Sequence, residues 1–183
     1  MTLQKHRPFR MWLLTLALGM TVACSAPLGL RRDEDAPVQT RALAYTLVEG
    51  ENGFAARVDI TYTFRNVSEE TVFILSCGGA PDVKLQRLDG GGWVSVWPSG
   101  GFGCDAPLAV IEPGGVWQGK VRLSGRSPGC GCFLEFSARP EGVHRIVLDD
   151  VVDGFATVGG SRFRGELIPL AQRVSNRFKL RVR

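Results

Sequence analysis

Cysteine is the residue type whose number and spacing in this chain most directly suggest chemistry. Of the five cysteines, Cys24 ends an apolar run, and the other four are Cys77, Cys104, Cys130 and Cys132. Four cysteines in an exported chain favour disulfides, with three possible pairings. We favour Cys77 with Cys104, because that bond would clamp the loops on either side of residues 83–97, while cross-pairings with Cys130 or Cys132 stay open.

Cys130 and Cys132 are separated by one glycine, which allows three interpretations. In an extended chain their Cα atoms lie near the upper limit of about 6.8 Å for a disulfide, so a bond there would be strained and easily reduced. A redox pair and a zinc or copper site are the alternatives, but such a metal site needs further soft or imidazole ligands. All three methionines lie within residues 1–20, and only His144 follows residue 23 as a histidine. We therefore favour a structural disulfide and expect no cofactor and no metal.

Neither His144 nor the acids that follow it form a catalytic or calcium-binding pattern. The parity of His144 places it on the apolar face of a strand over residues 143–148, which predicts a core-edge histidine with one hydrogen bond. A catalytic base would need a nucleophile and an orienting acid, and no serine stands in a nucleophile-elbow pattern. Asp149, Asp150 and Asp153 lack the spacing of a calcium loop and predict a solvated turn. The sequence therefore predicts a protein that is not an enzyme.

Two tryptophans are the candidates for partner binding. Trp93 and Trp97 alternate with Val94 and Val96 in a hairpin whose turn contains Gly90-Gly91-Gly92. Strict alternation with both valines in the core would place both tryptophans outside, where exposed aromatic side chains often anchor partners. The alternative is that loops such as residues 98–107 cover them.

The first 23 residues indicate export. Lys5, Arg7 and Arg10 precede an apolar run over residues 11–23, which is typical of a secretion signal. As a helix this run would rise only about 20 Å, short of the roughly 20 residues that a bilayer core needs. It ends in Thr21-Val22-Ala23-Cys24, which resembles a bacterial lipobox with lipid on Cys24. We expect an anchored protein of the cell envelope, at the outer membrane where there are two membranes.

The charge of the remaining chain argues against nucleic-acid binding. Residues 1–23 hold three of the 22 lysines and arginines and none of the 18 acids, which leaves 19 basic residues against 18 acidic ones. Residues 24–37 mix proline, glycine and charge and predict a flexible, lipid-anchored tether. Basic residues gather toward the C-terminus and predict a polar outer face that can touch anionic lipid or cell-wall polymer: Arg162, Arg164, Arg173, Arg177, Lys179, Arg181 and Arg183.

Residues 38–183 predict one all-β domain. In residues 56–66, Val58, Ile60, Tyr62 and Phe64 alternate with polar residues, the period of a half-buried strand. Seven or eight short strands separated by turn residues indicate an antiparallel, immunoglobulin-like β-sandwich. The other strand candidates are residues 42–48, 72–75, a hairpin over 83–97, 116–123, 132–138, 143–148 and 177–182.

A family resemblance covers residues 56–148. The order ITYTFRNVSEETVFI, then VKLQRLDGGGWVSVW, IEPGG and EGVHRIVL resembles bacterial lipoproteins with a single immunoglobulin-like domain. It is similar in outline to the BsuPI-like (intracellular proteinase inhibitor) domain, which shares an Asn-x-Ser turn after a strand, an aromatic hairpin and a Pro-Gly turn. His144 stands where those domains have a tyrosine, so this chain departs from the tyrosine-corner pattern at that position.

Three functions follow as hypotheses. The first is a lipid-anchored, non-enzymatic binding or structural module of the cell envelope, with a protein or cell-wall partner. The second, implied by the resemblance, is a proteinase inhibitor that presents the loop from Pro98 to Pro107. The third is a thiol-redox or metal-binding protein that uses Cys130 and Cys132.

Overall fold

The protein is an all-β sandwich. The computed structural model describes residues 30, 32–48, 56–77, 80–97, 106–125 and 140–183. Within these ranges there are fourteen strands and one short helix. Several of the strands have only two to four residues, which is why the sequence pattern predicted seven or eight. No helix in the described ranges has the length and hydropathy for a membrane span.

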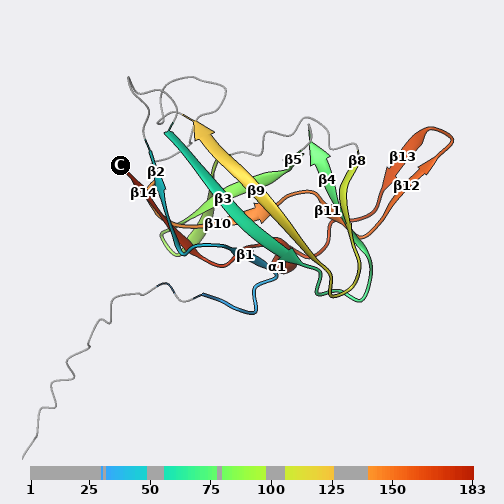
Figure 1. The fold of residues 1–183 in the computed structure, drawn as a ribbon, viewed down its shortest axis with the longest axis horizontal. Coiled ribbons are helices and arrows are strands. Elements are labelled where there is room, and N and C mark those ends of the chain that lie inside the picture. The colour runs from blue at the N-terminus through green and yellow to red at the C-terminus, as the bar shows by residue number, and fades with distance from the viewer. Residues whose placement is uncertain (1–29, 31, 49–55, 78–79, 98–105, 126–139) are drawn as a thin grey trace, which may run out of the picture.

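One layer of the sandwich is built around two long strands, β3 (Ala56–Arg65) and β9 (Val116–Gly125). They pair antiparallel along their full length, and β1 (Val38–Thr40) pairs with the other edge of β3. Figure 1 shows β3 and β9 crossing the molecule diagonally. The alternation predicted for residues 56–66 is confirmed, since Val58, Ile60, Tyr62 and Phe64 are all buried.

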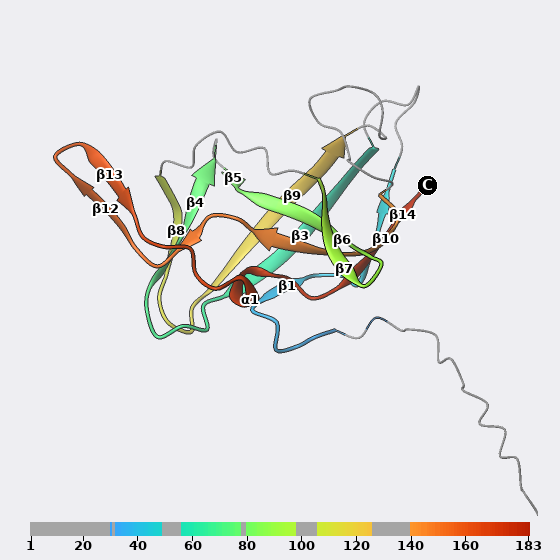
Figure 2. The same cartoon turned by 180° about the vertical axis from the view of Figure 1, so that it is seen from behind.

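The facing layer is a five-stranded sheet in the order β2-β14-β10-β6-β7. Its strands are β2 (Ala44–Leu47), β14 (Phe178–Val182), β10 (Gly142–Leu148), β6 (Val83–Asp89) and β7 (Gly92–Trp97). The view from behind in Figure 2 brings β6, β7 and β10 forward. One strand pair departs from the antiparallel arrangement, since β14 pairs parallel with β2.

A further sheet closes one end of the sandwich. It joins β4 (Val72–Cys77) to β11 (Val151–Val152), β5 (Ala80–Pro81) and β8 (Ala106–Ile111). Asn66 forms the predicted turn before β4: its side chain accepts the backbone N–H of Ser68 and donates to the carbonyls of Glu70 and Ile111. The predicted strand 132–138 lies outside the described residues.

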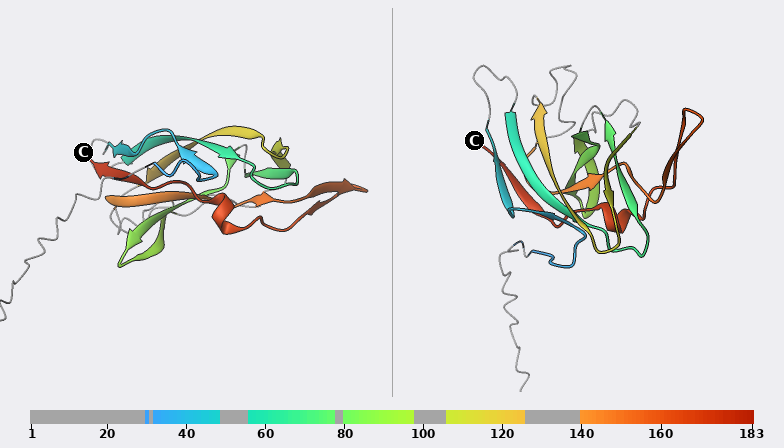
Figure 3. Two further views of the ribbon diagram at one scale, coloured as in Figure 1. Left: turned by 90° about the horizontal axis from the view of Figure 1, so that it is seen from below. Right: turned by 45° about the vertical axis from the view of Figure 1, so that its right-hand side comes forward.

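The remaining elements follow β11. β12 (Phe155–Val158) and β13 (Ser161–Arg164) form a hairpin that projects from the sandwich, as Figure 3 shows, and α1 (Leu170–Arg173) leads back to β14. Arg173 corrects the prediction of a polar C-terminal face. It is buried, and its guanidinium donates to the carbonyls of Ile168 and Leu148, at 2.8 and 2.9 Å.

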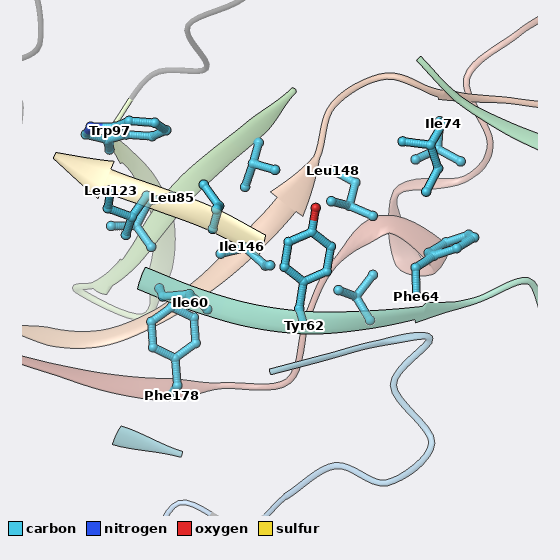
Figure 4. Packing of buried hydrophobic residues seen from close by; sticks show 14 of the residues in the cluster. Ile60, Tyr62, Phe64, Ile74, Leu85, Trp97, Leu123, Ile146, Leu148 and Phe178 are labelled. Carbon is cyan, nitrogen blue, oxygen red and sulfur yellow. The ribbon is translucent and has the colours of Figure 1, made fainter. Parts of the chain in front are cut away.

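The core lies between the two main layers (Figure 4). Tyr62 packs edge-to-face on Trp117, with ring centroids 5.9 Å apart, above Gly119 of the neighbouring strand. The Tyr62 hydroxyl is buried without a hydrogen-bond partner among the described residues, and burial raises the pKa of this phenol. On the opposite layer, Phe178 packs between Tyr45 and His144.

Candidate ligand-binding site

The two candidate tryptophans lie on opposite sides of the five-stranded sheet because β7 contains a bulge. Trp93 pairs with Leu88 and Ser95 with Gln86, but Leu85 then pairs with Trp97, so Val96 has no partner in β6. An extra residue in one strand reverses the inward and outward alternation beyond it. Trp93 therefore points to the outer face, while Trp97 points inward.

Trp97 is a core residue, which contradicts the prediction that both tryptophans project outward. It is 7% exposed, and its indole Nε1 donates a hydrogen bond to the carbonyl of Ser124 at 3.1 Å. Val96 is buried as expected, but Val94 is 49% exposed. The strict alternation assumed from the sequence failed because the bulge places two neighbouring residues, Val96 and Trp97, in the core.

Trp93 is half-buried on the outer face, beneath two arginines from other parts of the chain. The guanidinium carbon of Arg145, in β10, lies 4.3 Å from the centroid of the Trp93 ring. That of Arg177, just before β14, lies 5.8 Å from it. Both distances are within the range of cation–π attraction. The strand order β7-β6-β10-β14 explains the meeting, since Trp93 reaches across β6 to the two arginines.

Arg145 is held in place and electrostatically strained. Its Nε donates to Oε1 of Gln86, directly across the strand pair, at 2.8 Å. Burial, and then the charge of Arg177, lower the pKa of Arg145 below its ordinary value. Among the described residues, no carboxylate lies within ion-pair distance of Arg145 or Arg177. Two like charges therefore converge on one aromatic ring, and within the described ranges neither forms an ion pair with a carboxylate.

These side chains line a hollow of about 600 Å³ on the outer face of the sheet. Its apolar wall comes from Leu88, Val143 and Val174. A volume of this size lies within the range of about 300–1,000 Å³ typical of ligand sites. The hollow thus combines apolar surface, an aromatic ring and two positive charges.

The segment before β1 completes the rim of the hollow through Leu30 and Asp33. The predicted tether extends to residue 37, yet its described part contacts the domain. Arg32 donates to the carbonyl of Arg41 at 2.7 Å, and the side-chain amide of Gln39, in β1, donates to the carbonyl of Glu34. The described residues of the predicted tether therefore pass this site.

His144 is a core residue, as predicted. It is fully buried, and its Nδ1 donates to the Gly142 carbonyl at 3.1 Å, because a carbonyl can only accept. Its Nε2 is buried without a partner among the described residues. Burial, and to a smaller extent the charge of Arg87, lower the pKa of His144 to about 4, although the hydrogen bond to Gly142 opposes this. The imidazole is therefore neutral at ordinary pH.

The acids after β10 have structural partners. Asp149 pairs with Lys84, Asp150 pairs with Arg164 at 3.3 Å, and Asp153 accepts the backbone N–H of Glu166 at 2.8 Å. In the ranges that the structure describes, no three His, Cys, Asp or Glu residues gather closely enough to hold a metal ion.

The cysteine predictions fall almost entirely outside the described residues. Cys24, Cys104, Cys130 and Cys132 lie outside the described ranges, and Cys77 is the last residue of β4, with a side chain that is not described. The disulfide, redox and metal hypotheses therefore stay predictions. So does the inhibitory loop, since residues 98–105 are also outside the described ranges.

Comparison with known proteins does not identify a family for this chain. No family model matches the chain, and no curated protein matches it. Among solved structures, a match is the Pseudomonas fluorescens alkylpurine DNA glycosylase AlkC bound to DNA containing an abasic site analog. The sequence identity is 13% and the TM-score 0.33, over 80% of this chain and 31% of that chain. This chain thus spans about a third of that protein, and a likeness this weak carries no argument about function.

Proposed function

We propose that this chain is a lipid-anchored, non-enzymatic binding module of the bacterial cell envelope. In this proposal residues 1–23 direct export, Cys24 carries the lipid, and the sandwich presents the hollow at Trp93 to a partner. The observation that carries the binding role is the pair of guanidiniums on a half-buried tryptophan, 4.3 and 5.8 Å from the ring centroid. Tryptophan and arginine are the side chains most enriched where partners bind.

The position of the hollow supports a binding role for it rather than a role in holding the fold together. The core lies on the other face of the five-stranded sheet, where Leu85, Ile146 and Phe178 are fully buried. The Trp93 cluster adds nothing to that core. Collecting two like charges on one outer ring costs free energy, which binding of an anionic group would recover.

The anchor is tested by metabolic labelling with an alkynyl fatty acid. We expect the wild-type chain to be labelled and Cys24→Ala to be unlabelled, since the thiol is the site of lipid attachment. Ser25→Ala is the matched control and should be labelled like the wild type. Equal labelling of Cys24→Ala and wild type would refute the anchor.

The binding role is tested by co-sedimentation with purified cell envelopes, in a Cys24→Ala background that removes attachment through lipid. We expect this variant to co-sediment, and the double variant Cys24→Ala with Trp93→Ala to lose at least about tenfold in apparent affinity, as expected of a central aromatic anchor. Cys24→Ala with Lys179→Gln removes an exposed cation that does not line the hollow and should retain binding. Equal sedimentation of the Trp93 variant would exclude the hollow as the site.

A further inference from the structure

We infer that the hollow at Trp93 binds an acidic peptide segment that carries a leucine or similar apolar residue close to its carboxylates. This inference rests on the proposed binding role of the same hollow and adds the chemistry of the partner. It is drawn from the charge of the site, from its apolar wall, and from the stretch of this chain that already lies along its rim.

The positive charge of the two arginines favours a ligand with an oxyanion. The Nε of Arg145 is occupied by Gln86, which leaves its terminal nitrogens as donors, and Arg177 is exposed beside it. A planar guanidinium group binds a planar carboxylate through two parallel hydrogen bonds. The charge of Arg177 disfavours the protonated form of Arg145, and a bound carboxylate would reverse that effect.

The apolar wall of the hollow favours a ligand that carries an apolar group next to its anionic group. Leu88 and Val143 stand next to Trp93 on the outer face, and Val174 completes the wall. A simple anion such as inorganic phosphate would neutralise the arginines but leave this apolar surface in water. A ligand that fills the hollow therefore combines a carboxylate with a hydrophobic side chain.

The chain itself places an apolar and an acidic residue of one segment at the hollow. Leu30 and Asp33 both line the hollow, and Asp33 is followed by Glu34 and Asp35. An apolar residue and an acid three positions later are thus already present at the rim, in one peptide strand. Within the described ranges Asp33 forms no ion pair with Arg145 or Arg177, so a partner peptide of the same pattern that reaches further into the hollow would meet the wall and pair with the cations.

The test is fluorescence anisotropy of a dye-labelled peptide, acetyl-Leu-Ser-Ser-Asp-Glu-Asp-amide, with the full chain purified in mild detergent. We expect saturable binding that weakens as salt is added. The matched peptide with Asn-Gln-Asn in place of the acids should bind at least about tenfold more weakly. Arg145→Gln and Arg177→Gln should each lower the affinity about tenfold, whereas Lys179→Gln should change it less than about twofold. Asp33→Asn should raise the affinity, because it removes a negative charge that repels the acidic peptide at the rim of the hollow.

Four results of the peptide titrations would each overturn the inference. The first is that the acidic peptide does not bind, and the second is that the amide peptide binds equally well. The third is that Arg145→Gln and Arg177→Gln bind the acidic peptide with wild-type affinity. The fourth is that Asp33→Asn leaves the affinity unchanged. Displacement of the peptide by millimolar inorganic phosphate alone would reduce the site to a general anion site and would also overturn it. Tight binding of an oligogalacturonate in place of the peptide would overturn the peptide partner while leaving the proposed binding module intact. Circular dichroism of each variant separates loss of binding from loss of fold.

Discussion

Lowering the pH below about 6.5 should destabilise the folded domain through His144. The ring is fully buried, and its pKa falls from the ordinary 6.5 to about 4. Between these two pH values the unfolded chain binds a proton that the folded chain does not, so stability falls as the pH falls. Above pH 6.5 His144 is neutral in both the folded and the unfolded chain, so no stability is lost there through this residue. At 1.36 kcal/mol for each pKa unit, about 3 kcal/mol is lost by about pH 4.

Urea unfolding followed by tryptophan fluorescence, at several values between about pH 7 and pH 4, measures this loss. Carboxylates also titrate near the lower limit, so the quantity of interest is the difference between the wild type and His144→Gln. We expect the wild type to lose about 3 kcal/mol more than the variant over this range. NMR of the His144 ring gives an independent value, since residues 24–183 contain no other histidine.

The same pH dependence in His144→Gln as in the wild type would refute the reasoning. So would an NMR titration of the folded protein near pH 6.5. Either result would mean that the ring reaches water, or that Nε2 finds an acceptor on protonation, which would contradict its burial without a partner among the described residues.

Other changes test the packing. Gly119→Ala should lower the free energy of unfolding by about 2 kcal/mol or more, because a Cβ would lie 2.5 Å from Cζ of Tyr62. Gly92→Ala is the control and should cost under about 1 kcal/mol, because its Cβ would meet only the Asp89 carbonyl oxygen, at 3.8 Å. Urea unfolding compares the two variants. Trp97→Ala should cost about 3–5 kcal/mol and Trp93→Ala about 1 kcal/mol, and equal costs would contradict the bulge. Asn66→Ala should lower the free energy of unfolding by about 2–3 kcal/mol, since it removes hydrogen bonds to Ile111 and Glu70, and the thermal midpoint should fall accordingly. An unchanged midpoint would show that water replaces these hydrogen bonds.

The sequence pattern predicted strands well where pairing is regular. β3 has ten residues and pairs with β9 without interruption, so period two holds from Val58 to Phe64. It failed in β7, because a bulge depends on the register with β6 and leaves no reliable mark in the local sequence. The β12–β13 hairpin was not predicted either. Both of its strands are almost wholly exposed, so burial imposes no alternation on them.

The candidate site could be predicted only in part. Trp93 was identified, because an aromatic residue in a glycine-rich hairpin is visible in the sequence. Arg145 was not, since it follows a buried histidine and resembles any solvated strand residue. Its meeting with Arg177 and Trp93 depends on the order of four strands in a sheet, which no local pattern specifies.

The two ends of the domain are joined, which has a consequence for the order of folding. Asn176 binds the backbone N–H of Thr40 at 2.6 Å across a separation of 136 residues, and β14 pairs with β2. Strands β1 and β2 emerge early in synthesis but cannot complete these contacts until the last strand arrives. Such long-range closure is slow. Until it occurs, β2 and β10 have unpaired edges that other chains can join, so a chain cut before residue 176 should aggregate rather than lose only one strand.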